Sequence, residues 1–176
     1  QPLNSIVQTF LDLQNVAAGT VALRREATNL RAFLDEALDR GRLYAARKAI
    51  SIESRADDAP IVADKELLSY AVYNLLTNAV KYSPKQTIVR LDAEVLNDDV
   101  AISVTDQGYG VAPEERTRIF QRFYRTQRDK AGPEQGAGIG LALVKEIAEL
   151  HEGRVEVESR PGVGSRFTIR IPHTVP

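Results

Sequence analysis

The chain has 176 residues, 43% hydrophobic and 27% charged, so it is long enough to bury one sizeable core and too short for several. Its 23 basic and 24 acidic residues leave a net charge of -1, which gives no electrostatic reason to expect nucleic acid or an anionic membrane surface as a partner. The sequence has no cysteine, which excludes disulfides and thiolate metal sites, and no apolar run of membrane-spanning length. One globular domain with an appendage fits these limits, and the absence of any Met leads us to expect a longer protein upstream of Gln1.

The first part of the chain begins with an amphipathic helix. Apolar side chains recur at helical spacing over residues 3–13, and this stripe needs a partner, either the rest of the domain or a helix outside the sequence. A short strand is expected over residues 21–25. A second helix is predicted over residues 30–47, with Thr28 or Asn29 as its N-cap.

The middle of the chain is predicted to form a strand, a turn and a long helix. Residues 49–53 are strand-like, and the acidic, proline-containing run at residues 57–60 is typical of a turn. Asp64 offers the N-cap of a helix that continues to Tyr82. This helix is expected to end at Ser83-Pro84, because proline cannot continue it.

Two hairpins are predicted in the second half of the chain. Residues 87–96 and 100–105 flank the turn Asn97-Asp98-Asp99, and residues 154–159 and 166–171 flank Pro161-Gly162-Val163-Gly164. Residues 141–150, between the hairpins, are expected to be helical. Helices on one face of a mostly antiparallel mixed sheet make a two-layer α/β sandwich of the α+β class.

The helix ending at Tyr82 has two different faces. One is ordinary core, formed by Leu68, Val72, Leu75, Leu76 and Ala79. The other aligns Asn74, Asn78, Lys81 and Tyr82 at spacings of i, i+4, i+7 and i+8. Amide oxygens suit Mg²⁺, and a lysine ammonium can pair with phosphate. The alternative is a solvated face without a function.

Two glycine clusters lie where regular structure stops. Asp106-Gln107-Gly108-Tyr109-Gly110 follows a strand, and Gly136-Ala137-Gly138-Ile139-Gly140-Leu141 opens a helix. Glycines let backbone N–H groups approach a ligand, and a helix start attracts anions. An ionised aspartate only accepts hydrogen bonds, so Asp106 can take one from an exocyclic amine. The two clusters therefore predict a nucleotide site, with the base at one cluster and the phosphates at the other.

Together, these segments resemble the sequence boxes of sensor histidine kinases. Asn74–Tyr82 resembles the N box, Asp106–Gly110 the first glycine box, Ile119–Arg125 the F box and Gly136–Leu141 the second glycine box, in the family's order. The resemblance covers essentially the whole chain. It implies the Bergerat-type ATP-binding fold shared with type II topoisomerase ATPase domains, heat-shock chaperones and mismatch-repair proteins.

The resemblance also implies a division of the chain and a reaction. Residues 1–19 would be the C-terminal end of the dimerisation and phosphoacceptor hairpin, residues 20–176 the catalytic ATP-binding domain, and residues 121–138 its lid. With ATP and Mg²⁺ as cofactors, the γ-phosphate would pass to a histidine on the dimerisation hairpin of a homodimer, and then to a response regulator. The acceptor histidine is expected upstream of Gln1, and the domain is expected in the cytoplasm as part of a membrane-anchored sensor.

Roles for single residues follow from the same resemblance. Asp106 would accept a hydrogen bond from the adenine amine, and Asn78 would ligate Mg²⁺. The catalytic residues would be Asn74, Lys81 and Arg125. The other nucleotide contacts would come from Tyr82, Gly108, Gly110, Gly136, Gly138, Gly140 and Leu141. Ala137 departs from the family pattern, in which Ser or Thr supplies a hydroxyl.

Alternatives within the superfold are an ATP-hydrolysing enzyme and a purely nucleotide-binding module. In the hydrolysing relatives a Glu typically stands at the position of Asn74 and acts as a general base. The two histidines are not expected to be phosphoacceptors, although His151-Glu152-Gly153-Arg154 superficially resembles an acceptor motif. No proline follows it and a strand pattern begins at Val155, so His151 is expected to be a charged residue at a helix C-terminus or a packed neutral ring.

Overall fold

The computed structural model describes residues 23–121 and 140–173. Its α-helices are α2 (Leu30–Ala45), α3 (Lys65–Tyr82) and α5 (Gly140–Leu150), and its 3-10 turns are η1 (Ala46–Lys48), η2 (Pro113–Glu115) and η3 (Arg118–Phe120). Its strands are β1 (Glu26–Asn29), β2 (Ser51–Ala56), β3 (Pro60–Ala63), β4 (Ile88–Leu96), β5 (Asp99–Thr105), β6 (Arg154–Arg160) and β7 (Gly164–Pro172).

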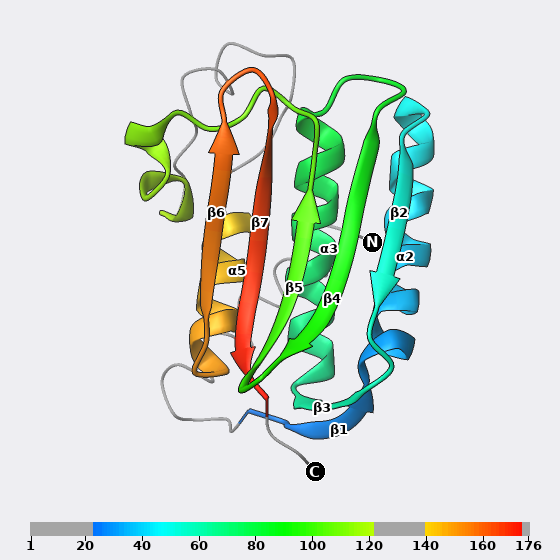
Figure 1. The fold of residues 1–176 in the computed structure, drawn as a ribbon, viewed down its shortest axis with the longest axis vertical. Coiled ribbons are helices and arrows are strands. Elements are labelled where there is room, and N and C mark those ends of the chain that lie inside the picture. Colours follow the sequence, from blue (N-terminus) through cyan, green and yellow to red (C-terminus); the bar gives the residue numbers. More distant parts are fainter. Residues whose placement is uncertain (1–22, 122–139, 174–176) are drawn as a thin grey trace.

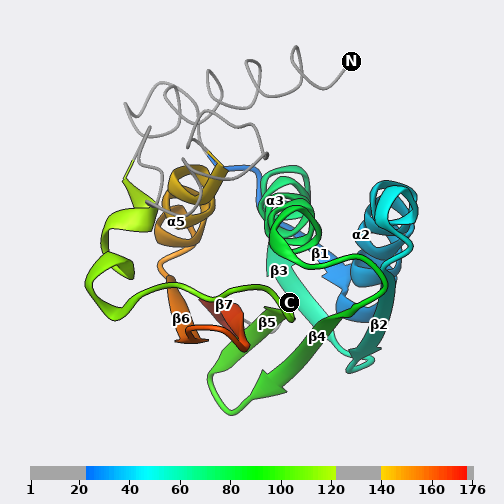
Figure 2. The same ribbon diagram turned by 90° about the horizontal axis from the view of Figure 1, so that it is seen from above.

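The described strands form one large sheet and one small one. The large sheet has five strands in the order β2-β4-β5-β7-β6, and only the β2–β4 pair is parallel. The three helices lie in a row over one of its faces, as the view from above shows (Figure 2). Strands β1 and β3 make the separate antiparallel pair at the lower end in Figure 1. The predicted α+β sandwich with a mostly antiparallel mixed sheet is confirmed.

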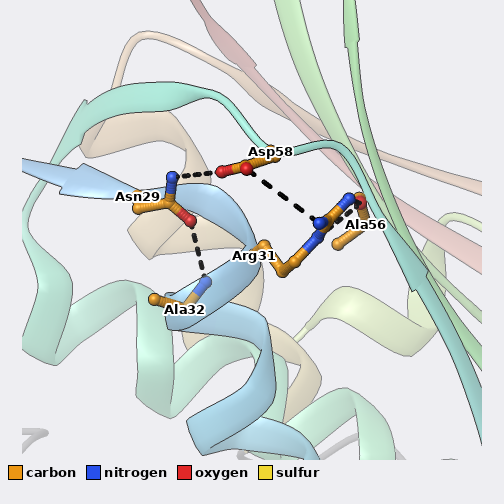
Figure 3. Close-up of polar contacts among 5 residues, drawn as sticks. All are labelled: Asn29, Arg31, Ala32, Ala56 and Asp58. Atoms are coloured by element: carbon orange, nitrogen blue, oxygen red, sulfur yellow. Dashed lines mark hydrogen bonds and ion pairs between the residues drawn. The ribbon is translucent and has the colours of Figure 1, made fainter.

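The start of α2 is held by a small polar network (Figure 3). Asn29 Oδ1 accepts the Ala32 N–H at 3.0 Å, which makes Asn29 the N-cap, and Asn29 Nδ2 donates to Asp58 Oδ1 at 2.7 Å. Arg31 Nε and Nη2 donate to the Ala56 carbonyl at 3.2 and 3.0 Å. A capping side chain of this kind contributes about 1 kcal/mol, so the network fixes where the helix begins more than it stabilises the fold.

Helix α3 is capped at both ends by charged side chains. At its start, Asp64 Oδ1 accepts the Leu67 N–H at 3.1 Å, as predicted. At its end, Lys48 Nζ in η1 donates to the carbonyl oxygens of Val80, Lys81 and Ser83 at 3.1, 2.7 and 3.0 Å. A cation at the C-terminus of a helix satisfies carbonyls that have no partner within the helix and interacts favourably with the helix dipole.

The core lies between the helices and the sheet. The apolar stripe of α2 is formed by Leu30, Phe33, Leu34, Ala37 and Leu38, and that of α3 by Leu68, Val72, Leu75, Leu76 and Ala79. Gly41 lets α2 pack closely, because a Cβ there would lie 2.9 Å from Leu76 Cδ1 and 3.2 Å from Ile52 Cδ1. The sequence pattern therefore assigned the core face of α3 correctly.

Several boundaries differ from the sequence-based expectation. Of the expected strand over residues 21–25, only residues 23–25 are described, and they are not a strand; the first described strand is β1 at Glu26–Asn29. It pairs with β3, which the turn pattern at residues 57–60 had hidden. Helix α2 was expected to reach residue 47, but it ends at Ala45 and passes into a 3-10 turn. Strand β2 was expected from residue 49, but Ala49 is left-handed, with φ 55°, and the strand begins at Ser51.

The expected N-terminal helix fragment at residues 1–19 and nearly all of the expected lid lie outside the described residues. Among the helices that the structure describes, none is long and apolar enough to cross a membrane.

Candidate functional site

Asp106 lies directly after β5, and the C-terminal end of β5 points toward the upper end of the molecule in Figure 1. Its side chain is almost fully buried, and Oδ1 accepts the N–H of Gly108 at 2.8 Å and that of Ser165 at 3.2 Å. Burial raises the pKa of the Asp106 carboxyl above its ordinary value of 3.8, and the two N–H donors partly offset this. Within the described residues no hydrogen bond to Oδ2 is formed, so this oxygen is left for a donor on a ligand.

The turn after Asp106 is packed so tightly that two of its positions require glycine. A Cβ on Gly108 would lie 2.7 Å from the Tyr82 carbonyl oxygen, which belongs to the end of α3. Gly110 has φ +79°, and a Cβ there would lie 2.5 Å from the Arg160 carbonyl oxygen at the β6–β7 turn. The turn is therefore wedged between α3 on one side and the β6–β7 hairpin on the other.

The polar face of α3 faces the same region. Asn74, Asn78, Lys81 and Tyr82 are all half-buried, unlike the apolar residues on the opposite side of the helix. The Tyr82 ring packs edge-on against Tyr109 of the turn, with ring centroids 5.7 Å apart, and Lys81 Nζ lies 5.6 Å from the Tyr82 centroid. These contacts connect Lys81, the predicted phosphate residue, to the predicted base turn through Tyr82.

The start of α5 lies beside Asn74. A Cβ on Gly140 would be 3.8 Å from both Cγ and Oδ1 of Asn74, which is ordinary contact distance. Asn74 Nδ2 is buried and makes no well-formed hydrogen bond with any residue that the structure describes. Burial raises the pKa of the neighbouring Tyr70 hydroxyl, and the Asn74 amide partly offsets this. A buried donor without a partner costs about 1–3 kcal/mol, so Asn74 is a group that a ligand oxygen would satisfy.

The structure brings together most of the sequence-predicted site. Asn74, Asn78, Lys81, Tyr82, Asp106, Gly108, Gly110 and Gly140 lie along α3, the turn after β5 and the start of α5. Leu141 is half-buried and packs against the hydrophobic core. Arg125, Gly136 and Gly138 lie outside the described residues.

His151 is a structural residue. Its Nδ1 donates to the Ile147 carbonyl at 2.8 Å, and its Nε2 accepts the Asp64 N–H at 3.0 Å, a pattern that requires the neutral ring. Burial lowers the pKa of the ring below its ordinary value of 6.5. Because both nitrogens are occupied, His151 fastens the end of α5 to the start of α3 and has no free nitrogen to accept a phosphoryl group.

Sequence reasoning missed the residues of the β6–β7 turn. The hairpin itself was predicted. The sequence did not indicate that Ser165 would donate its N–H to Asp106. It also did not indicate that Gly164 would lie so close to Asp106 that an added Cβ would be 2.1 Å from the Asp106 carbonyl oxygen. The only sequence signal was the glycine-rich turn itself, and its partner in space is set by the pairing of β5 with β7.

Comparison with known protein families gives one match that covers most of the chain. Residues 63–175 match the family described as histidine kinase-, DNA gyrase B-, and HSP90-like ATPase. This range begins just before α3 and includes every predicted site residue.

Similar proteins include two mycobacterial sensor kinases. The chain is 32% identical to the sensor-like histidine kinase SenX3 of Mycobacterium bovis over 174 residues, which is 97% of this chain and 42% of that protein. It is 32% identical to the sensor histidine kinase MtrB of Mycolicibacterium paratuberculosis over 171 residues, 96% of this chain and 30% of that protein. The chain thus spans less than half the length of either relative.

Two solved structures share the fold. The mycobacterial sensor histidine kinase MprB superposes with a TM-score of 0.73 at 28% identity, covering 87% of this chain and 100% of that one. The structure of full-length ShkA in complex with AMPPNP superposes with a TM-score of 0.84 at 29% identity, covering 98% of this chain and 36% of that one.

Proposed function

The chain belongs to the histidine kinase-, DNA gyrase B-, and HSP90-like ATPase family, and from this premise we propose that it is the catalytic ATP-binding domain of a sensor histidine kinase. The observation that carries the proposal is the buried Asp106 carboxylate in a glycine turn that packs against the polar face of α3. In this proposal the domain transfers the γ-phosphate of ATP to a histidine on a separate dimerisation hairpin.

The proposal extends to the whole protein. Residues 1–19 belong to the dimerisation hairpin and residues 20–176 to the catalytic domain. The complete protein is a membrane-anchored homodimer whose catalytic domain is cytoplasmic, and it passes the phosphoryl group to a response regulator. The sensor kinase relatives support this assignment.

The base half of the site would be formed by the turn after β5. Asp106 Oδ2 would accept a hydrogen bond from the adenine amine, while Oδ1 remains occupied by the N–H groups of Gly108 and Ser165. Gly108 and Gly110 would keep the pocket open by letting the backbone pass close to its neighbours. Tyr82 would lie against the nucleotide.

The phosphate half would be formed by α3, the start of α5 and Arg125. Asn74 and Asn78, one turn apart on the half-buried face, offer the amide oxygens that suit Mg²⁺, so the residues present fit the ion. Asn78 would be its ligand, and bound Mg²⁺ would neutralise phosphate charge. Lys81 and Arg125 would pair with the phosphates, and Gly136, Gly138 and Gly140 would let the backbone approach them.

Asn74 favours a kinase over a hydrolase. Hydrolysis requires a base to activate water. The ATP-hydrolysing members of the superfold that the sequence resembles typically have Glu at the position of Asn74. A neutral amide has no useful basicity, so Asn74 can orient a ligand but cannot take a proton from water. The γ-phosphate would then be transferred only when the hairpin supplies a histidine imidazole as the acceptor.

A transfer assay with radiolabelled γ-phosphate tests the proposal. The protein is incubated with Mg²⁺-ATP, with and without a dimerisation hairpin that carries the acceptor histidine. We expect acid-labile label on the hairpin, slow phosphate release without it, and no label on the domain itself. Lys81→Ala should reduce transfer at least about tenfold, the loss expected for one charge-assisted phosphate contact, whereas the exposed Lys85→Ala should not.

One outcome would overturn the kinase assignment, and another would overturn the purely structural role of His151. Rapid phosphate release that does not depend on the hairpin would make the domain an ATP hydrolase. Acid-labile label on His151 would mean that the buried ring, with both nitrogens hydrogen-bonded, is nevertheless a phosphoacceptor.

A further inference from the structure

The side chain of Ser159, near the end of β6, lies at the centre of a hydrogen-bond cluster beside the base turn. Its Oγ accepts the Val111 N–H at 2.6 Å, donates to the Gly164 carbonyl at 3.2 Å and lies 3.0 Å from Ser165 Oγ. A hydroxyl has one donor and two acceptor positions. Since Ser159 donates to Gly164, it accepts from both Val111 and Ser165, and all three positions are used.

The partners of Ser159 lie at the two ends of the base turn. Ser165 is bonded to Asp106 through its backbone, because its N–H donates to Asp106 Oδ1 at 3.2 Å and its carbonyl accepts the Asp106 N–H at 2.9 Å. Val111 directly follows Gly110, where the turn ends. One hydroxyl therefore connects the start and the end of the segment that carries the Asp106 carboxylate.

Further contacts hold the hairpin against the turn and against the segment that follows the turn. The Gly162 N–H donates to the Tyr109 carbonyl at 2.7 Å, and Arg116 Nη2 donates to the Ser159 carbonyl. These bonds use backbone carbonyls, so they do not depend on the Ser159 hydroxyl. Replacing that hydroxyl would leave these bonds between the hairpin and the turn in place, but it would remove a side chain that connects the two ends of the turn.

We propose that Ser159 is a positioning residue for base recognition: its hydroxyl fixes the Asp106 turn on the β6–β7 hairpin, so that the carboxylate is already placed to accept the exocyclic amine. This rests on the proposed function, because it needs adenine at Asp106. A site that is already ordered loses less entropy when it binds, and a shift of a fraction of an ångström is enough to weaken a directed hydrogen bond. Ser159 would thus determine how strongly the site prefers adenine over guanine, which presents a carbonyl where adenine presents its amine.

Binding selectivity distinguishes this role from a general contribution to stability. Calorimetric titration would measure the dissociation constants of ATP, GTP and inorganic tripolyphosphate for the parent, Ser159→Ala, Ser159→Thr and Ser165→Ala. We expect Ser159→Ala to weaken ATP about tenfold, the effect of one ordinary hydrogen bond, and to leave tripolyphosphate unchanged, so that the ATP to GTP preference falls about tenfold. Ser159→Thr should recover the parent ratio, because it keeps the hydroxyl and a β-branched residue suits a strand.

The matched control is Ser103→Ala. Ser103 Oγ is buried and lies 2.9 Å from Thr168 Oγ1 in the same sheet, so this variant also removes a hydroxyl pair but leaves the base turn intact. It should lower the midpoint of thermal unfolding without changing the ATP to GTP ratio. Ser165→Ala removes one partner of Ser159 and should lower the ratio in part, which keeps the test decisive if Ser159→Ala does not fold.

The inference is wrong if Ser159→Ala and Ser165→Ala bind ATP and GTP in the parent ratio, if ATP and tripolyphosphate weaken equally, or if Ser159→Thr fails to recover selectivity. Failure of the proposed function looks different. In that case the unaltered protein itself would show no preference for ATP over GTP.

Discussion

Replacing Asp106 with Asn should separate nucleotide binding from folding. The Asn amide oxygen can keep the Gly108 and Ser165 N–H bonds that Oδ1 accepts at 2.8 and 3.2 Å, while an NH₂ group replaces Oδ2. Under the proposed function, this sets a donor against the adenine amine. Losing a hydrogen bond to a charged acceptor costs about 1.5–3 kcal/mol, and leaving a buried donor unpaired costs about 1–3 kcal/mol more. ATP affinity should therefore fall by at least about a hundredfold.

Stability should change in the opposite direction. Burial raises the pKa of the Asp106 carboxyl, which means that the fold favours the neutral form. The contribution of Asp106 to stability is therefore complete below its ordinary pKa of 3.8 and is lost as pH rises through the raised value. The Asn variant is neutral at every pH, so at pH 7 it should unfold at a temperature no lower than the parent.

Calorimetric titration with ATP and thermal unfolding between pH 4 and pH 8 would measure both effects. The difference in unfolding temperature should shrink toward the acid end. Asp98→Asn is the matched control, because Asp98 is an exposed carboxylate in the β4–β5 turn. An ATP affinity within threefold of the parent would refute the assignment of the base pocket, and an unfolding temperature several degrees lower at pH 7 would refute the argument from burial.

Two further predictions concern the ends of α3. Lys48→Met keeps the aliphatic stem but removes the three hydrogen bonds to the carbonyls at the end of α3. The free energy of unfolding measured in urea should therefore fall by about 1–3 kcal/mol. An unchanged free energy would show that the Lys48 cap is dispensable. Burial lowers the pKa of His151, so its contribution to stability is complete above pH 6.5 and is lost as pH falls through the depressed value. The parent should therefore lose stability as the pH falls below 6.5, and this loss should be absent in His151→Gln. An equal slope in both proteins would assign the loss to another group.

Local patterns in the sequence predicted much of the fold. The helical periodicity of α3 and its N-cap Asp64 are local features of the sequence, and so are the two hairpins with their clear turn residues. The segment β3 is only four residues long and follows a turn, so it had no pattern of its own. The parallel pairing of β2 with β4 joins strands separated by the whole of α3, and no local signal specifies it.

The sequence indicated the candidate site residues themselves but not the residues that hold them in position. Asn74, Tyr82 and Asp106 stood out because amides, an aromatic ring and an acid in a glycine turn are unusual at those positions. Ser165 contacts Asp106 because β5 and β7 pair with Thr105 opposite Arg166, a register that depends on the complete sheet. Lys48 donates to carbonyls at the end of α3, more than thirty positions later in the chain, and no sequence pattern around Lys48 predicts this contact.

Asp106 and Asn74 of the candidate site differ from two structural polar residues, and the difference points to the ligand. The buried His151 uses both ring nitrogens and the half-buried Lys48 makes three hydrogen bonds, as expected of polar groups removed from water in a folded protein. Asp106 instead has a pKa raised by burial, and Asn74 Nδ2 has no well-formed bond with any described residue. Asp106 needs a donor and Asn74 Nδ2 needs an acceptor. A nucleotide supplies both, the donor from its base and the acceptors from its phosphates, which is why it suits this site better than a free base or a free phosphate.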